Sequence, residues 1–278
     1  MITDARLDAL LVEDAPHGDL TTESLGIGSF PGRLVFTVRE PLVLAGAEEA
    51  ARLLGRAGAK PKLHASSGVA LRRDELVLEA SGTAAAVHLG WKAALHLLEH
   101  LSGIATRTRR IVDAARSGAG RDVPIAATRK GFPGTRDLAL LGVRAGGGIA
   151  HRLGLSDSIL VFQQHAAFLE EGVPGAIERM RRTQPERKIA VEVSSVDEAV
   201  AAARAGAHLV QVEKVGPREF AEVVRACRMH EAPPLVAATG GVDESNAEAY
   251  AAAGADLLVT SAPWFAKPAE IRATISRR

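Results

Sequence analysis

Two pairs of basic or potentially basic side chains occur within one short stretch of the chain. Arg129 and Lys130 follow a short apolar run, and His151 and Arg152 follow the glycines at 146–148. A helix-like stretch over residues 135–145 separates the two pairs. A solvated helix has no need of cations gathered around both of its ends, whereas a polyanion is bound by such a cluster. The pattern therefore predicts a site for a polyanion.

Carboxylates and glycines follow three further apolar runs. Glu192 lies at the end of the run 188–193, and Glu213 with Lys214 follows the run 208–212. Thr239, Gly240 and Gly241 follow the run 234–238 and precede a helical segment. Glycine lets backbone N–H groups approach an anion, and a helix N-terminus favours negative charge. The Thr-Gly-Gly sequence is therefore a candidate phosphate cradle.

These runs belong to a regular alternation of strand-like and helix-like segments. The strand-like runs are 124–128, 157–162, 188–193, 208–212, 234–238 and 256–260, and the helical segments include 195–207 and 243–255. Such alternation predicts βαβ units and a parallel sheet. Repeats of similar size favour an α/β barrel, closed or nearly so, over an open doubly wound sheet with the same local signals. Groups that follow barrel strands lie at the active-site end.

The first hundred residues have a different pattern. The ranges 33–40 and 75–80 read as strands, with a helix over 45–58 between them. A long amphipathic helix is expected from Gly90 to about Ser117, where it bridges to the barrel. We therefore predict an N-terminal α+β domain over 1–110, with the tail 265–278 packing back on it, and a barrel domain over 111–264.

Composition limits the possible partners. The 278 residues carry a formal net charge of +1, so no bulk field favours nucleic acid or a membrane surface. No apolar stretch approaches the ~20 residues that span a bilayer, and the N-terminus does not resemble a signal peptide. The single Cys227 lies in a helix-like segment, where a buried thiol is expected, and it fits a reducing compartment. We expect a cytoplasmic protein that acts on small molecules.

Each candidate residue also has an ordinary structural interpretation. Arg129 and Lys130 are compatible with surface charge, His151 with a core histidine bonded to a carbonyl, and Glu192 with a structural ion pair. The glycines at 146–148 are also suited to ending a helix, and His17 and Asp19 to forming a turn. What favours function is that cations, carboxylates and glycines fall together at one end of the predicted barrel.

Several longer motifs add a resemblance. They are EDAPHGDLTTE near the start, LEHLSGIATRT on the long helix, TRKGFPGTRDLALLGVRAGGGIAHRLGLSDSIL in the barrel, then VEVSSVDEA, AGAHLVQVEK and ATGGV. Together they resemble the type II quinolinate phosphoribosyltransferases, also called nicotinate-nucleotide pyrophosphorylases, over nearly the whole chain. The resemblance implies an N-terminal α/β sandwich domain, an open-faced TIM-like α/β barrel, and homodimers with a shared active site that in some members assemble further.

The chain departs from that family at several positions. Members that use quinolinate have an arginine on the long helix, which reaches the partner's site, where this chain has Lys92; they have a lysine where this chain has Phe162. The other departures are Gln163 and Gln164 for Asp-Asn, Glu213 and Lys214 for a second Asp-Asn, and Ser261 for a glycine. The combination of WK, FPGTR and ILVFQQH resembles the ModD subgroup, which is associated with molybdate-transport operons.

The resemblance implies a role for each position. Arg129, Lys130, His151 and Arg152 would line the pocket for an acidic acceptor beside phosphoribosyl pyrophosphate (PRPP), together with Lys92, Phe162 and Lys214. Lys92 keeps charge without the bidentate fork of arginine, and Phe162 supplies an apolar wall. A dianionic pyridine dicarboxylate therefore fits less well than a less acidic or partly apolar heterocycle.

The expected reaction is Mg²⁺-dependent transfer of ribose 5-phosphate from PRPP to a ring nitrogen. Glu192 and Glu213 would stabilise the ribosyl cation, directly or through Mg²⁺. Lys130 and Lys214 would neutralise pyrophosphate, and Thr239, Gly240, Gly241 and Ser261 would hold the 5-phosphate. Two alternatives remain open: true quinolinate phosphoribosyltransferase activity in NAD biosynthesis, and a non-catalytic anion-binding accessory of molybdate transport.

Overall fold

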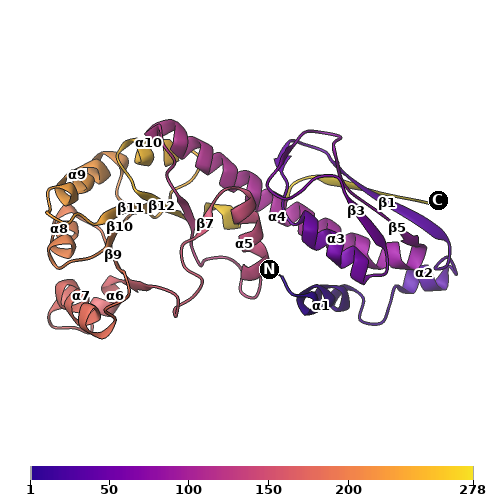
Figure 1. Cartoon of the computed structure of the whole chain (residues 1–278), viewed down its shortest axis with the longest axis horizontal. Helices are drawn as coiled ribbons and strands as arrows, with labels where there is room; N and C mark the ends of the chain where they lie inside the picture. The colour runs from indigo at the N-terminus through magenta and orange to yellow at the C-terminus, as the bar shows by residue number, and fades with distance from the viewer. Residues whose placement is uncertain (1, 278) are drawn as a thin grey trace. The chain divides into compact units, whose positions relative to one another are not determined.

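The computed structural model describes residues 2–277, which form two compact units (Figure 1). The first contains the chain up to Arg109, then Phe132–Gly147, then the chain from Trp264 onward. The second contains Arg110–Gly131 and Gly148–Pro263. The segment Phe132–Gly147 therefore belongs with the first unit, although it lies inside the range 111–264 that the sequence analysis assigned to the barrel.

The first unit contains an antiparallel four-stranded sheet in the order β13-β1-β5-β3. Its strands are β1 (Pro31–Val38), β3 (Lys60–Leu63), β5 (Leu76–Thr83) and β13 (Ile271–Arg277). Along β1, Leu34, Phe36 and Val38 are buried, because alternate side chains of a strand point to one face. The C-terminal tail forms β13, which pairs with β1 along its length.

Helices accompany this sheet in the first unit, and most of them contribute buried side chains to its apolar core. They are α1 (Asp4–Asp14), α2 (Leu20–Ser24), α3 (Ala47–Arg56), α4 (Ala84–Ala119) and α5 (Arg136–Ala145), and a small ribbon pairs β2 (Leu42–Val43) with β4 (Ala70–Leu71). In α3 the buried residues Ala47, Ala50, Leu53 and Leu54 recur at helical spacing, as expected for an amphipathic helix. The long helix is confirmed, and α4 begins six residues before the predicted Gly90 (90 − 84 = 6).

The second unit is a parallel seven-stranded sheet in the order β7-β6-β12-β11-β10-β9-β8. Its strands are β6 (Ile125–Ala127), β7 (Ile149–Ala150), β8 (Ile159–Val161), β9 (Ile189–Val193), β10 (Leu209–Glu213), β11 (Leu235–Thr239) and β12 (Leu257–Thr260). The early strand β6 pairs with the late strand β12, as in a barrel, while β7 and β8 form the two ends of the sheet. The α/β fold with an open-faced barrel is therefore confirmed.

Helices α8 (Val196–Arg204), α9 (Pro217–Arg228) and α10 (Ala247–Ala252) accompany β9 to β12 in this unit (Figure 1). Two further helices, α6 (Gln163–Ala166) and α7 (Gly172–Thr183), follow β8, and a 3₁₀ turn, η1 (Ala262–Phe265), follows β12. Cys227 on α9 is buried, as predicted. Between residues 2 and 277, no helix has the length and apolarity required to cross a membrane.

Candidate active site

The parallel sheet brings the two basic pairs together. Because β6 and β7 are neighbours, Ala127 and Ala150 are register partners at the ends of these strands. The backbone N–H of His151 donates to the Ala127 carbonyl at 2.9 Å. Arg129 and Arg152, which follow the two strands, are close enough for each other's charge to matter. Residues separated by α5 in the sequence therefore form one cationic cluster.

Arg152 is the buried member of this cluster. Its side chain is 8% exposed, and its Nη1 donates to the Ser158 carbonyl at 3.5 Å. Its guanidinium carbon lies 5.7 Å from the ring centre of Phe162, which stacks in turn on His165 at 5.5 Å. Burial, and then the charge of Arg129, lower the pKa of Arg152. A desolvated cation beside a second cation favours binding of an anion.

His151 gives this cluster a pH-dependent effect on stability. Burial, and then the charges of Arg152 and Arg129, lower its pKa, since each disfavours the imidazolium form. The folded protein therefore binds this proton less readily than the unfolded chain does. The resulting stabilisation is present above about pH 6.5, the unfolded value, and is lost as the pH falls through the folded pKa. We expect wild type to lose more unfolding free energy on acidification than His151→Gln.

Urea unfolding at about pH 7.5 and about pH 5.5 measures this difference. The control is His17→Gln, which removes a histidine at an exposed turn position outside the cluster. Parallel profiles for wild type and His151→Gln would contradict the expectation.

The two predicted carboxylates lie on adjacent strands. Glu192 on β9 is half-buried, and Glu213 ends β10. Burial and then the like charge of Glu213 raise the pKa of Glu192, while a hydrogen bond from Gln211 and the charges of Lys130 and Lys214 act in the opposite direction. Lys214 Nζ lies 3.1 Å from Glu213 Oε1. The acidic pair therefore lies within electrostatic reach of both predicted pyrophosphate lysines.

The candidate phosphate residues follow β11 and β12. Gly240 and Gly241 have φ angles of +83° and +86°, left-handed values that favour glycine. Next to them Thr239 is buried, and the hydroxyls of Thr128 and Ser261 lie 2.8 Å apart across β6 and β12. The sequence predicted that a helix over 243–255 begins close to these glycines. That prediction is wrong, because the helix is shorter and α10 begins only at Ala247. Any cradle there depends on the turn and the hydroxyls.

Lys92 differs from the other predicted site residues, because it belongs to the first unit and they belong to the second. It is exposed on α4 in the first unit, and its Nζ lies 4.8 Å from the ring centre of Trp91. His17 and Asp19 also lie in that unit, where Asp19 Oδ1 accepts from the N–H groups of Thr21 and Thr22 and caps α2. Asp19 therefore has the structural role that the turn interpretation allowed.

The sequence analysis missed two residues of the second unit. Thr128 follows β6 and contacts Ser261, and Gln211 in the middle of β10 donates from Nε2 to Glu192 Oε2 at 2.9 Å. The available signal was a glutamine inside an apolar strand of a parallel sheet, where both faces are normally apolar.

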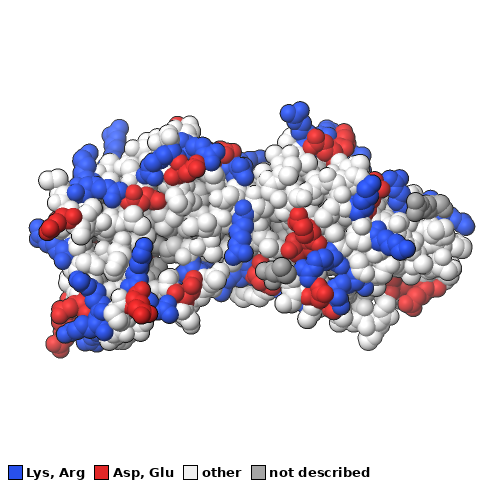
Figure 2. Space-filling model, viewed as in Figure 1, with Lys and Arg blue, Asp and Glu red and all other residues white. Residues whose placement is uncertain are grey.

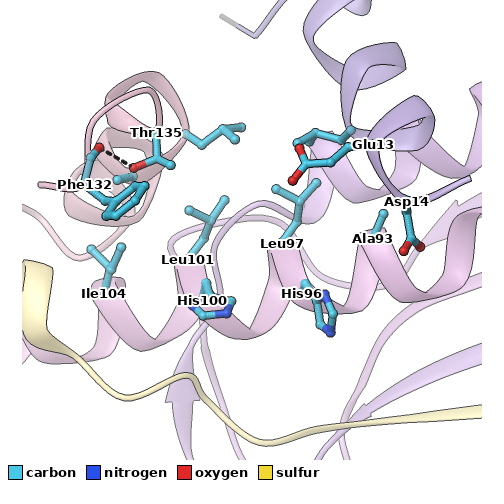
Figure 3. Close-up of a pocket in the computed structure, with 13 residues that line it drawn as sticks. Glu13, Asp14, Ala93, His96, Leu97, His100, Leu101, Ile104, Phe132 and Thr135 are labelled. Atoms are coloured by element: carbon cyan, nitrogen blue, oxygen red, sulfur yellow. Dashed lines mark hydrogen bonds between the residues drawn. The ribbon is translucent and has the colours of Figure 1, made fainter. Parts of the chain in front are cut away.

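A separate cavity of about 550 Å³ lies within the first unit, lined by α1, α4 and the start of α5 (Figure 3). Leu97 and Leu101 of α4 line it, with His96 and His100 below them in this view, and Glu13 faces it from α1. Its lining is largely apolar and contains none of the predicted site residues. On the face shown in Figure 2, positive and negative side chains are interspersed, so anion binding relies on local clusters.

Family comparisons cover most of the chain. Residues 19–102 match the model for the quinolinate phosphoribosyl transferase N-terminal domain, and residues 104–270 match the model for its C-terminal domain. The chain is 43% identical over 252 residues to a Rhodobacter capsulatus protein named "Putative pyrophosphorylase ModD", covering 89% of this chain and 95% of that protein. It is 31% identical over 278 residues to a carboxylating nicotinate-nucleotide pyrophosphorylase of Mycobacterium leprae, covering 94% and 95%.

Solved structures agree with this assignment. The crystal structure of NadC from Streptococcus pyogenes has a TM-score of 0.90 and 25% sequence identity, covering 100% of this chain and 99% of that one. The domain matches, the relatives and the fold all identify the same group of proteins. The chain therefore belongs to the quinolinate phosphoribosyltransferase family, and the ModD proteins are among its relatives.

Proposed function

We propose that this protein transfers a phosphoribosyl group from PRPP to a heterocyclic acceptor less acidic than quinolinate. The observation that carries the proposal is the arrangement at the carboxyl ends of the parallel strands. A cationic cluster follows β6 and β7, one carboxylate lies near the end of β9 and another ends β10, and left-handed glycines follow β11. Anion binding alone needs the cations, whereas ribosyl transfer also needs acids near the developing positive charge.

In the proposed reaction the bond from ribose C1 to pyrophosphate breaks and a bond from C1 to a ring nitrogen forms. The bonding electrons leave with pyrophosphate, so positive charge develops on the sugar. Glu192 and Glu213 stabilise that charge or bind the hydroxyls beside it, and Lys130 and Lys214 offset the charge of the departing pyrophosphate. The residues at 239–241 and Ser261 hold the 5-phosphate.

The carboxylates also suit Mg²⁺, which favours oxygen ligands and usually retains water or substrate oxygens. Between residues 2 and 277, no group of three or more His, Cys, Asp or Glu side chains is placed to hold a metal. Glu192 and Glu213 would hold the ion together with oxygens of PRPP. When bound, it supplies positive charge to the pyrophosphate oxygens.

Pyrophosphate release from PRPP and Mg²⁺ tests the proposal, with quinolinate and a panel of pyridines carrying one or no carboxylate as acceptors. We expect release with a panel member and little with quinolinate. Release that depends on quinolinate and yields nicotinate mononucleotide would assign the alternative activity in NAD biosynthesis. PRPP binding without turnover of any acceptor would favour a non-catalytic binder, and no PRPP binding would reject all phosphoribosyl chemistry.

We expect Phe162 to determine which acceptor the protein prefers. Its ring contacts the Arg152 guanidinium and His165, so it offers a flat apolar wall where a quinolinate-using enzyme is expected to have lysine. Phe162→Lys should raise kcat/KM for quinolinate by about tenfold or more, since a charge-assisted pair with a carboxylate is worth ~1.5–3 kcal/mol.

The matched control is Phe168→Lys, which replaces a phenylalanine that is 88% exposed and should leave quinolinate use unchanged. Equal kcat/KM values for Phe162→Lys and wild type would show that this position does not select the acceptor.

We further propose a homodimer in which Lys92 completes the partner's site. The proposal rests on the family resemblance and on the exposure of Lys92 on α4, which belongs to the first unit, whereas the other candidates belong to the second. Mixing Lys92→Ala protein with Glu192→Gln protein should restore turnover. A mixed dimer, with one subunit of each variant, contains one site in which both Lys92 and Glu192 are intact. Mixtures as inactive as the separate variants would contradict a shared site.

A further inference from the structure

Gln211 is a buried amide in the middle of β10. It is 3% exposed and is the register partner of Glu192 on β9. Its Nε2 donates to Glu192 Oε2 at 2.9 Å. Its other polar atom, Oε1, is buried and has no hydrogen-bond partner among the atoms of residues 2–277. Half of this amide is therefore engaged, and the other half is left unpaired.

Packing alone does not explain a glutamine at this position. Ala237 is its register partner on β11, and Ala237 packs with Ala126 and Val259 in a small apolar cluster. A buried carbonyl oxygen without a partner destabilises the folded protein, whereas an apolar side chain of similar size leaves nothing unpaired. Methionine would therefore suit the stability of this sheet at least as well as glutamine does.

The engaged half of the amide acts on Glu192. That carboxylate is faced by the like charge of Glu213 and by the cations Lys130 and Lys214. Glu213 and Lys214 lie at the end of β10 and Lys130 follows β6, and the negative and positive charges have opposite effects on the carboxylate. A donor fixed within the sheet holds one oxygen of Glu192 at a defined place, which leaves the other oxygen oriented for a ligand. Hydrogen-bond partners that orient metal-binding carboxylates in this way commonly affect metal affinity or activity by about 10–100-fold.

We infer that Gln211 is a positioning residue for phosphoribosyl transfer: its amide N–H₂ holds Oε2 of Glu192 so that the other carboxylate oxygen is presented to the sugar. The inference rests on the proposed function. It implies that the chain retains an unpaired buried oxygen because the other half of the same amide is needed by Glu192. Replacing the amide should therefore lower activity without lowering stability.

The test is Gln211→Met, with Gln211→Leu as a second apolar variant if the first folds poorly. We expect unchanged or higher thermal stability together with a fall in kcat of about 10–100-fold and little change in KM for PRPP. Gln184→Met, at an exposed glutamine, is the matched control and should leave both quantities unchanged. Full activity in a stable variant overturns the inference. So does a loss that merely follows the unfolded fraction, which would make Gln211 structural.

Crystal structures of wild type and Gln211→Met give a second readout that needs no turnover. The variant should show Glu192 in more than one orientation, and an unchanged single orientation overturns the inference. If wild type turns over no acceptor, the proposed function fails while this comparison still reports on positioning. If wild type is active and the variant equals it, the inference alone fails.

Discussion

Replacing Glu192 by glutamine should lower kcat by about 100-fold or more while PRPP remains bound. The reason is that the amide keeps the shape of the side chain, and still accepts from Gln211, but cannot stabilise positive charge on the ribosyl ring. Loss of one group aimed at developing charge typically lowers kcat by about 10²–10³-fold. Pyrophosphate release and PRPP titration calorimetry measure the two quantities. A purely anion-binding protein would be indifferent to the change.

The same substitution should stabilise the resting protein in metal-free buffer at neutral pH. Burial and the charge of Glu213 raise the pKa of Glu192, so the folded protein binds this proton more readily than the unfolded chain does. The carboxyl contributes stability while it is protonated, and that contribution is lost as the pH rises through its folded pKa. Glu192→Gln should therefore melt higher than wild type near neutral pH, and the gap should close on acidification.

Glu231→Gln, at an exposed position, controls for the loss of a charge elsewhere on the second unit. It should leave turnover unchanged, and its melting is measured at the same pH values for comparison. A Glu192→Gln protein that keeps wild-type kcat would remove Glu192 from the mechanism, whatever its melting temperature.

The second large effect is expected at Gly240. A Cβ there would lie 2.7 Å from Lys214 Cγ and 2.9 Å from the Lys214 backbone nitrogen, which donates to the Thr239 carbonyl. Lys214 itself has a left-handed φ of +55°, so its backbone has little freedom to move aside. Gly240→Ala should cost ~1–3 kcal/mol from overpacking beyond its backbone strain. It should also weaken PRPP binding by displacing Glu213 and Lys214.

Gly241→Ala separates these contributions. Its φ of +86° is as unfavourable for alanine, but its Cβ would meet nothing within 4 Å. It should therefore lose only the backbone contribution of ~1–2 kcal/mol, measured by urea unfolding. Equal destabilisation by both variants would show that the contact with Lys214 does not contribute to the loss of unfolding free energy in Gly240→Ala.

Much of this fold follows from patterns within short windows of sequence. All six predicted strand runs of the second half are strands, because short apolar runs between helical segments suit a sheet buried on both faces. The strand β7 was missed, since two residues after three glycines carry almost no periodicity. The end of α5 at the glycines was predictable: Gly146 is the C-cap, and Gly147 has a φ of +92°.

The type and order of the chemical groups were also available from the sequence, since side chains that follow parallel strands share one edge. The contacts among those groups required the tertiary structure. Pairing of β6 with β7 places His151 beside Ala127, pairing of β9 with β10 joins Gln211 to Glu192, and the turn after β11 presses Gly240 against Lys214. The sequence around α5 likewise gave no signal that this helix belongs to the first unit.

The physical reason is the range of the forces involved. Periodicity, glycine preference and residue chemistry act within a few positions along the chain, so the sequence alone determined the elements and the kinds of groups that follow them. Strand order, burial and charge–charge distance depend on residues far apart in sequence. Only the folded chain decided that Glu192 is held by a buried amide and that Arg152 is a buried cation against an aromatic wall.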